Sequence, residues 1–141
     1  MSLRLKLKPY EQLHIGATVI ANGAAPADLT ISGTKMPLLR GGEFIPELAA
    51  TTPCKKLYLR IQTAYLNEIS DPYVEHQIIE DINAIVEAAP SLKRVALGVS
   101  SNLVSGDYYK CLIACRGLIS EEALLLSCVD HFESLMIGAK H

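Results

Sequence analysis

The sequence contains no tryptophan, and aromatic residues make up only 6% of its 141 residues. A core must therefore be built from aliphatic side chains, which is feasible because half of the residues are hydrophobic and only a fifth are charged. The longest uncharged stretch, residues 12–27, is broken by glycine, asparagine and proline and lacks the layout of a signal peptide. We therefore expect a protein without a membrane segment that stays in the cytoplasm.

Motifs for several kinds of chemistry are also missing. The chain has no Walker-type glycine loop, no GxGxxG, no CxxC or HxxxH pair, and no histidine placed near a serine or cysteine as in a nucleophile arrangement. Residues 41–44 spell the GGEF signature of cyclic-dinucleotide cyclases, but only short strands precede them, so a strand-to-helix turn is the better interpretation. We expect no enzyme activity and no cofactor.

The four cysteines allow two interpretations. Cys111 and Cys115 are four residues apart on an expected helix, from which both could reach a metal ion. Their apolar neighbours instead favour small buried side chains, and we expect all four cysteines, including Cys54 and Cys128, to be reduced and structural. We therefore expect no metal. His14 is predicted to lie on the surface, and the adjacent acidic pairs at 80–81 and 121–122 are predicted to be solvated.

Apolar residues alternate with cations over residues 3–8, LRLKLK, which predicts a strand with a cationic outward face. Further short strands are expected over residues 12–21, 29–31 and 36–39. Asn22-Gly23 is a hairpin signal, although Pro26 suggests a longer loop. Glycine and proline between these segments are typical of a small antiparallel β module.

After Pro46 the apolar period becomes helical. Thr52-Pro53 and Asp71-Pro72 each combine a capping side chain with proline at the first helical position. Further helices are expected from Leu92, from residues 105–107, and from Leu118 to about Leu135. The predicted fold class is α+β, with a small N-terminal antiparallel β module over residues 1–46 followed by a C-terminal helical bundle over residues 47–141.

The charges are divided unevenly. Residues 1–60 hold eight basic and four acidic residues, +4, whereas residues 61–141 hold five basic and eleven acidic ones, −6, which together give the net charge of −2. A basic end suggests contact with a polyanion. The alternative is a solvated edge strand whose cations prevent unwanted pairing. The candidate RNA-binding residues are Arg4, Lys6, Lys8, Lys35 and Arg40.

Three segments keep a fixed order along the chain: LKLKPYEQLHIGATVI, TTPCKKLYLRIQTAYL and SGDYYKCLIACRGLI. In this succession the chain resembles the FlbT family of bacterial flagellar biosynthesis regulators, to about Leu126. The resemblance implies action after transcription on flagellin mRNA, alongside a partner called FlaF. The family is expected to have a Tyr-Glu pair where this chain has Ser-Glu-Glu at residues 120–122. This departure affects only the expected helix contacts near these residues.

Residues 3–45 are also similar to CsrA-type translational regulators, through LRLKLKPYEQLHIG, LTISGTK and MPLLRGGEFI. This second resemblance implies an intertwined β dimer that binds GGA-containing hairpin loops of mRNA leaders. Arg4, Lys6 and Arg40 match the contact positions of those proteins, whereas Leu39 stands where they have histidine.

Together these observations favour a post-transcriptional regulator that binds the flagellin mRNA leader through the β module and forms a homodimer. The alternative is a protein-binding adaptor or chaperone that acts through FlaF or flagellin without touching RNA. An acidic, apolar helical bundle would suit that role.

Overall fold

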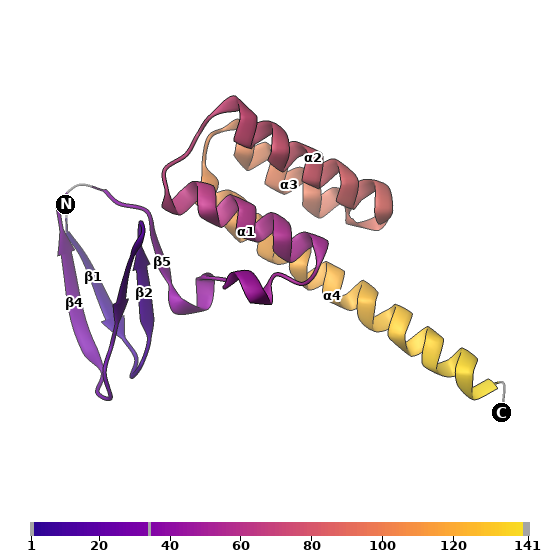
Figure 1. Ribbon diagram of the computed structural model, residues 1–141, viewed down its shortest axis with the longest axis horizontal. Helices are drawn as coiled ribbons and strands as arrows, with labels where there is room; N and C mark the ends of the chain where they lie inside the picture. Colours follow the sequence, from indigo (N-terminus) through magenta and orange to yellow (C-terminus); the bar gives the residue numbers. More distant parts are fainter. Residues whose placement is uncertain (1, 34, 140–141) are drawn as a thin grey trace.

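The computed structural model describes residues 2–33 and 35–139, and the side chains of residues 132–134 and 136–139 are outside the description. Five short strands precede a helical region, so the predicted α+β class is confirmed (Figure 1). The strands and helices are β1 (Ser2–Leu7), β2 (Gln12–Ile15), β3 (Thr18–Ala21), β4 (Ala27–Ser32), β5 (Leu38–Arg40), α1 (Pro53–Leu66), α2 (Pro72–Ala88), α3 (Lys93–Val104) and α4 (Tyr108–Ala139), with short 3-10 turns η1 (Gly41–Glu43), η2 (Glu47–Ala49) and η3 (Pro90–Leu92).

The strands form two antiparallel sheets. β1 pairs with β4, and β2 lies between β3 and β5. The single strand predicted over residues 12–21 is therefore wrong: it is a hairpin that turns at Gly16, whose positive φ of 57° favours glycine. Asn22-Gly23 does not close a hairpin, because β3 and β4 belong to different sheets; residues 22–26 form the longer loop that Pro26 suggests. The Asn22 amide instead holds the loop by donating to the carbonyls of Lys8 (2.8 Å) and Ala25 (2.9 Å).

Two helix starts follow the sequence signals directly. The Thr52 side chain accepts a hydrogen bond from the Lys55 amide (3.3 Å), and the Asp71 side chain accepts one from the Val74 amide (2.8 Å). In both helices the next residue is proline, which has no N–H that could be left without an acceptor. The predicted starts of α1 and α2 are confirmed.

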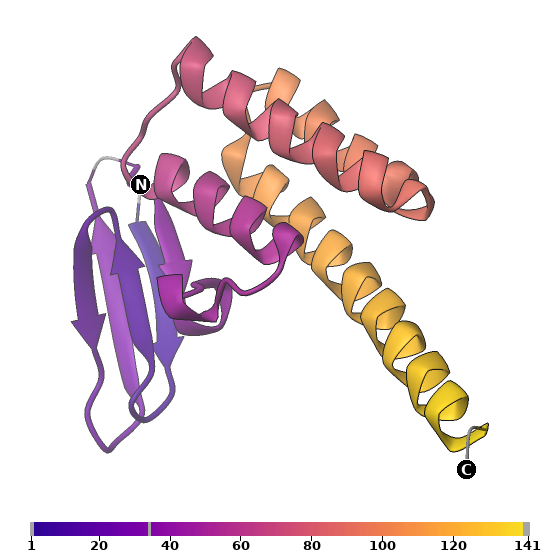
Figure 2. The same cartoon turned by 45° about the vertical axis from the view of Figure 1, so that its right-hand side comes forward.

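The two helices predicted after residue 105 are one continuous helix, α4. Gly117 lies inside it and does not end the helix; a Cβ at this position would make an ordinary van der Waals contact with Cγ1 of Val95 at 3.5 Å. The first half of α4 packs on α1 and α3, while its second half extends past the other helices (Figures 1 and 2).

One cluster of buried side chains joins the helices, and Leu39 of β5 belongs to it. Cys54, Cys111 and Cys115 are buried in this cluster as free thiols, as predicted, and burial raises the pKa of Cys111 to about 12. Cys128 is exposed. Within the described ranges, no helix has the length and apolar character needed to cross a membrane.

Two side chains predicted to be solvated are buried instead. His14 stacks on Phe44 with ring centroids 3.7 Å apart and an interplanar angle of 6°, and burial lowers the pKa of the imidazole. Glu122 is only 8% exposed, because its carboxylate accepts hydrogen bonds from the Thr52 hydroxyl and from the Cys54 amide (3.0 Å) at the start of α1. The negative charge therefore lies at the positive end of the α1 dipole.

Replacing Glu122 by alanine should lower the free energy of unfolding by about 1–3 kcal/mol, because the buried Cys54 N–H would lose its acceptor. Urea unfolding followed by circular dichroism measures the change. Glu121→Ala, which removes the neighbouring exposed carboxylate from the same helix, is the matched control. Equal stability of the two variants would contradict the capping role.

Candidate nucleic-acid interface

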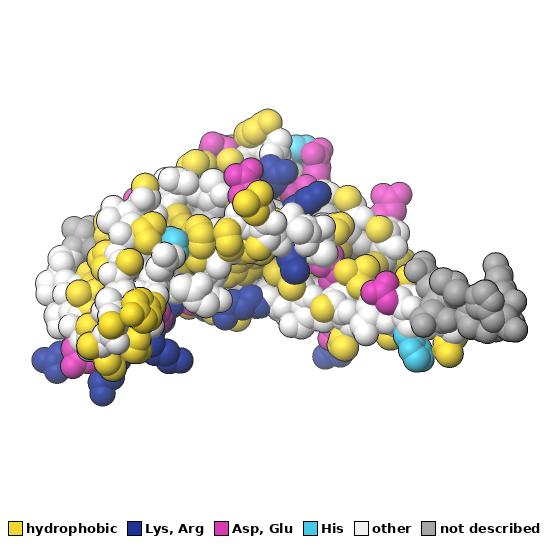
Figure 3. All heavy atoms as spheres, turned by 60° about the horizontal axis from the view of Figure 1, so that its bottom comes forward, with side chains coloured by type: hydrophobic (Ala, Val, Ile, Leu, Met, Phe, Trp, Pro, Cys, Tyr) yellow, Lys and Arg dark blue, Asp and Glu magenta, His cyan; other side chains and the backbone are white. Residues whose placement is uncertain are grey.

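Arg4 and Lys6 lie on the outward face of β1. Both side chains are exposed, and in the register of the β1–β4 pair they stand opposite Thr30 and Asp28. Leu3 and Leu5 occupy the other face, because successive strand residues alternate between faces. Lys and Arg side chains gather at the β end of the molecule in the space-filling view (Figure 3). The cationic strand face predicted from the sequence is therefore present.

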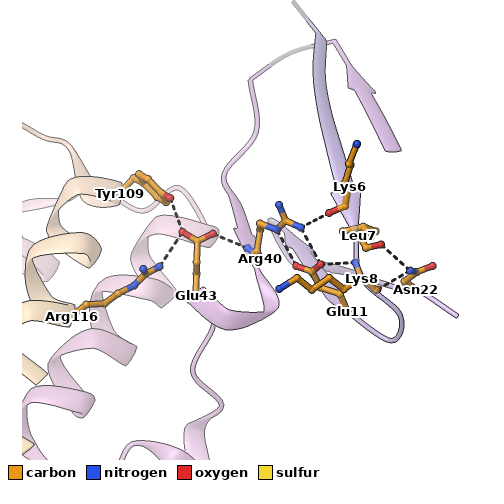
Figure 4. A network of polar contacts seen from close by, with 9 residues as sticks. All are labelled: Lys6, Leu7, Lys8, Glu11, Asn22, Arg40, Glu43, Tyr109 and Arg116. Carbon is orange, nitrogen blue, oxygen red and sulfur yellow. Dashed lines mark hydrogen bonds and ion pairs between the residues drawn. The ribbon is translucent and has the colours of Figure 1, made fainter. Parts of the chain in front are cut away.

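Glu11 connects the end of β1 to β5. Its carboxylate accepts a hydrogen bond from the Lys8 amide (2.9 Å) and two from the Arg40 guanidinium, from Nε (2.9 Å) and Nη2 (3.0 Å). Arg40 Nη2 also donates to the carbonyl oxygen of Lys6 (Figure 4). The structure thus joins Arg40 to Glu11 and to the Lys6 carbonyl, and Glu11 to the Lys8 amide, so the contacts of both lysines are made by their backbones.

This bidentate pair changes the ionisation of both partners. Hydrogen bonds from Arg40 and from the Lys8 amide lower the pKa of Glu11 to about 2, and the same contact raises the pKa of Arg40. The guanidinium is therefore always charged, but a neighbouring carboxylate balances its charge. Arg40 positions β1 against β5, which the sequence analysis did not foresee.

Lys35 is placed differently from the other candidates. It is exposed and lines a cavity of about 850 Å³ between the β region and the helices, together with Leu3, Leu5 and Arg40. Because Leu3 and Leu5 lie on the opposite face of β1 from Arg4 and Lys6, the five candidates do not form a single continuous face. Arg4, Lys6 and Lys8 remain as the outward group.

Glu43 joins the β region to the helices. Its carboxylate accepts hydrogen bonds from the Arg40 amide (3.0 Å), the Tyr109 hydroxyl (2.6 Å) and Arg116 Nη2 (3.0 Å), and its carbonyl accepts one from the Tyr58 hydroxyl (Figure 4). The GGEF segment is therefore a strand-to-helix turn, as predicted. A glutamate three residues after the last strand residue is a helix-start signal that could have identified Glu43. The contact of Glu11 with Arg40 has no such signal, because the two residues are distant in sequence.

The environment of Glu43 favours the carboxylate. Burial opposes ionisation, but the hydrogen bonds from Tyr109 and the Arg40 amide and the charge of Arg116 outweigh it and lower the pKa. The same hydrogen bond raises the pKa of Tyr109 to about 12. At neutral pH the contact therefore joins an ionised carboxylate to a neutral hydroxyl and a charged guanidinium.

Glu43→Gln should lower the free energy of unfolding by about 1–3 kcal/mol, because charge-assisted hydrogen bonds become neutral ones and an amide group must face donors. Urea unfolding at pH 7 measures this effect. Glu47→Gln, an exposed glutamate in η2, is the control and should leave the stability unchanged. Equal losses in both variants would contradict the joining role of Glu43.

Thermal stability should fall as the pH is lowered from about 4.5 to about 2, because Glu11 has a folded-state pKa of about 2, below the ordinary value of 4.5 for a glutamate. A carboxyl group with a lowered folded pKa stabilises the fold above the unfolded pKa and loses that contribution as it becomes protonated. In Glu11→Gln the melting temperature should fall less over this range, and in Glu47→Gln as much as in the parent. Melting curves at constant ionic strength test this, and an unchanged slope in Glu11→Gln would refute it.

Comparison with known proteins places this architecture in one family. Residues 3–126 match the family described as "Flagellar protein FlbT". A "Probable flagellum biosynthesis repressor protein FlbT" of Rhodopseudomonas palustris (strain TIE-1) is 37% identical over 128 residues, which cover 90% of this chain and 99% of the relative. "Probable flagellum biosynthesis repressor protein FlbT 1" of Bradyrhizobium diazoefficiens is 34% identical over 126 residues, 89% of this chain and 85% of the relative.

A more distant relative, "Flagellum biosynthesis repressor protein FlbT" of Caulobacter vibrioides (strain ATCC 19089 / CIP 103742 / CB 15), is 26% identical over 124 residues, 86% of this chain and 87% of the relative. No solved structure matches the chain. The matched segment includes both the β region and the helices through most of α4, so the similarity is not confined to one part of the fold. The chain belongs to the FlbT family of flagellar proteins.

Proposed function

We propose that this protein regulates flagellin synthesis in the cytoplasm by binding the leader of flagellin mRNA through the outward face of β1. The relatives are named for repression of flagellum biosynthesis, which supports a regulatory role. The observation that carries the RNA contact is the exposed pair Arg4 and Lys6, two residues apart on one strand face and therefore about 6.6 Å apart along the strand. Such a row of cations suits a phosphate backbone.

The candidate residues take different roles in this proposal. Arg4, Lys6 and Lys8 contact phosphates directly. Arg40 contributes mainly by holding Glu11 and the backbone of β1 in position, since its guanidinium already makes three hydrogen bonds. Lys35 lies to one side, at the cavity between the β region and the helices, and would meet only RNA that passes over the strand edge.

Protein partners complete the proposal. A homodimer would present two cationic faces, one from each copy, and FlaF or flagellin would bind elsewhere than on β1. The alternative function is an adaptor that acts through FlaF or flagellin with no RNA contact. It is favoured by the exposed apolar side chains of the helical region, including Leu124 and Val129. The RNA-binding function requires the cations on β1, whereas the adaptor function does not.

Removing Arg4 and Lys6 together by alanine substitution should weaken binding of a labelled flagellin leader and make binding less dependent on salt. At about 0.7 per phosphate contact for a single strand, the slope of log K against log salt should change by about 1.4. Fluorescence anisotropy over a salt series measures both quantities. Lys93→Ala/Arg94→Ala removes the same charge from an exposed position at the start of α3 and should leave the slope unchanged.

A substitution that makes the same face more positive should raise its affinity for RNA. Asp28 stands across from Lys6 in the β1–β4 pair, so Asp28→Asn removes a negative charge from the proposed surface and should strengthen RNA binding. If the double alanine variant and Asp28→Asn both bind the leader as tightly as the parent at low and moderate salt, β1 is not the RNA-binding surface. Regulation that persists in those variants would then favour the adaptor function.

A further inference from the structure

Tyr10 follows the cationic strand β1 in a backbone conformation that tyrosine rarely adopts. Its φ is 62°, in the left-handed region that favours glycine. Pro9 precedes it, and the Glu11 amide donates to the Lys8 carbonyl (3.1 Å), which closes residues 8–11 into a β-turn. Proline in the second position and a positive φ in the third are the pattern of a type II turn, whose third position usually holds glycine or asparagine. Here that position holds a large aromatic residue.

Hydrogen bonds to neighbouring segments fix the backbone of this turn. The Tyr10 amide donates to the Gly23 carbonyl (2.8 Å). The Lys8 amide donates to the Glu11 carboxylate (2.9 Å), and the Asn22 side chain donates to the Lys8 carbonyl (2.8 Å) (Figure 4). A residue other than glycine keeps a left-handed conformation only where its surroundings impose it. The position of Tyr10 is therefore set before any ligand binds.

The ring of Tyr10 takes little part in holding the turn. Tyr10 is 73% exposed, so its ring is not packed in a core. The hydrogen bonds that fix the turn come from the Tyr10 backbone and from other residues. Glycine would adopt the same φ without strain. A ring that adds strain and gains little burial is better explained by contact with another molecule than by stability of the turn.

Positive charge lies next to the ring. Lys8 is exposed two residues before Tyr10, so their Cα atoms are at most about 7 Å apart. Within residues 2–33 the acidic residues are Glu11 and Asp28. Arg40 pairs with Glu11, which leaves Asp28 alone to oppose the cations of β1 and the turn. Exposed cations beside an aromatic ring are the combination that binds single-stranded nucleic acid, because cations contact phosphates while the ring stacks on a base.

The surroundings of the ring suit a base better than a protein surface. Hot spots of protein interfaces lie in well-packed pockets among other contact residues. The residues joined to Tyr10 by the hydrogen bonds of the turn are Lys8, Glu11, Asn22 and Gly23, and none of them has a large apolar side chain. Stacking on a base needs only one aromatic face, because every base has a π-face of its own.

We propose that the Tyr10 ring stacks on an unpaired base of the RNA whose phosphates contact Arg4, Lys6 and Lys8. The RNA at this position is single-stranded, because the bases of a duplex are stacked on one another, whereas those of loops and bulges can be splayed out onto an aromatic ring. The inference rests on the proposed function and adds a preference for unpaired RNA. The cations alone do not provide that preference, since phosphates are present in both forms.

Tyr10→Ala should weaken binding of a labelled RNA of mixed sequence without self-complementarity by about fivefold or more, the loss expected for one base–ring stack. The slope of log K against log salt should equal that of the parent, because no charge is removed. The same RNA annealed to its complement should bind the parent and the variant equally, and Tyr10→Phe should keep the parent affinity for the single strand. Fluorescence anisotropy measures all of these quantities.

Tyr73→Ala is the matched control for this loss. Tyr73 is 70% exposed, close to the value for Tyr10, but it lies at the start of α2 between Asp71 and Glu75. Carboxylates repel the phosphates that accompany a base, so Tyr73→Ala should leave the affinity for the single strand unchanged.

Two further variants separate stacking from a structural role of the ring. Tyr10→Gly removes the ring and the strained φ together, so its melting temperature should be at least as high as that of the parent while its RNA affinity falls as in Tyr10→Ala. Because the chain has no tryptophan, Tyr10→Trp introduces a single one at the site. Its fluorescence should be quenched when the single-stranded RNA is added, whereas that of Tyr73→Trp should not change.

Unchanged single-strand affinity in Tyr10→Ala, an equal loss on the duplex, or no quenching in Tyr10→Trp would overturn the stacking inference. Weaker regulation of flagellin by Tyr10→Ala with unchanged RNA affinity would also overturn it and would indicate that the ring binds a protein. In each of these cases the proposed function stands if removal of Arg4 and Lys6 still lowers the affinity and the salt slope. A parent protein that binds no RNA would refute the proposed function and the stacking together.

Discussion

The fold depends on one carboxylate, that of Glu43, which holds the β region against the helices. It follows β5 in a 3-10 turn and accepts hydrogen bonds from the backbone of β5 and from two side chains of α4, while its carbonyl accepts one from α1. Every donor points at this one residue, and an ionised group bonds such donors more strongly than a neutral amide does. The position of the strands relative to the bundle depends on this contact together with the burial of Leu39 in the core and the hydrogen bonds between Leu38 and Tyr65.

A second carboxylate decides how much positive charge the β end presents. Arg40 adds to the basic count of the first sixty residues, but Glu11 binds its guanidinium bidentately and balances its charge. The cations that remain outward are those of β1 and of the turn that follows it. Charge counted along a sequence therefore overstates the charge available to a ligand wherever folding pairs distant residues.

Local signals in the sequence predicted the local structure well. The alternation of leucine and cation in residues 3–8 gave β1 with the expected outward face, and the Thr52-Pro53 and Asp71-Pro72 caps gave the starts of α1 and α2. The predictions for His14 and Glu122 were wrong, because their burial comes from residues that are far away in the chain or on another element. The hairpin at Gly16 was missed because its two strands are so short that their joint apolar pattern resembles one strand.

By itself, the sequence determined the fold class, the helix starts, the cationic strand and the family, since each depends on neighbouring residues or on an ordered set of segments. Only the tertiary structure decided which cations face outward, which carboxylates accept hydrogen bonds from backbone amides, and which part of α4 lies outside the bundle. The physical reason is that burial and ion pairing are properties of distance in space. Glu11 and Arg40, or Glu122 and Cys54, become partners only when strands and helices far apart in the chain are packed together.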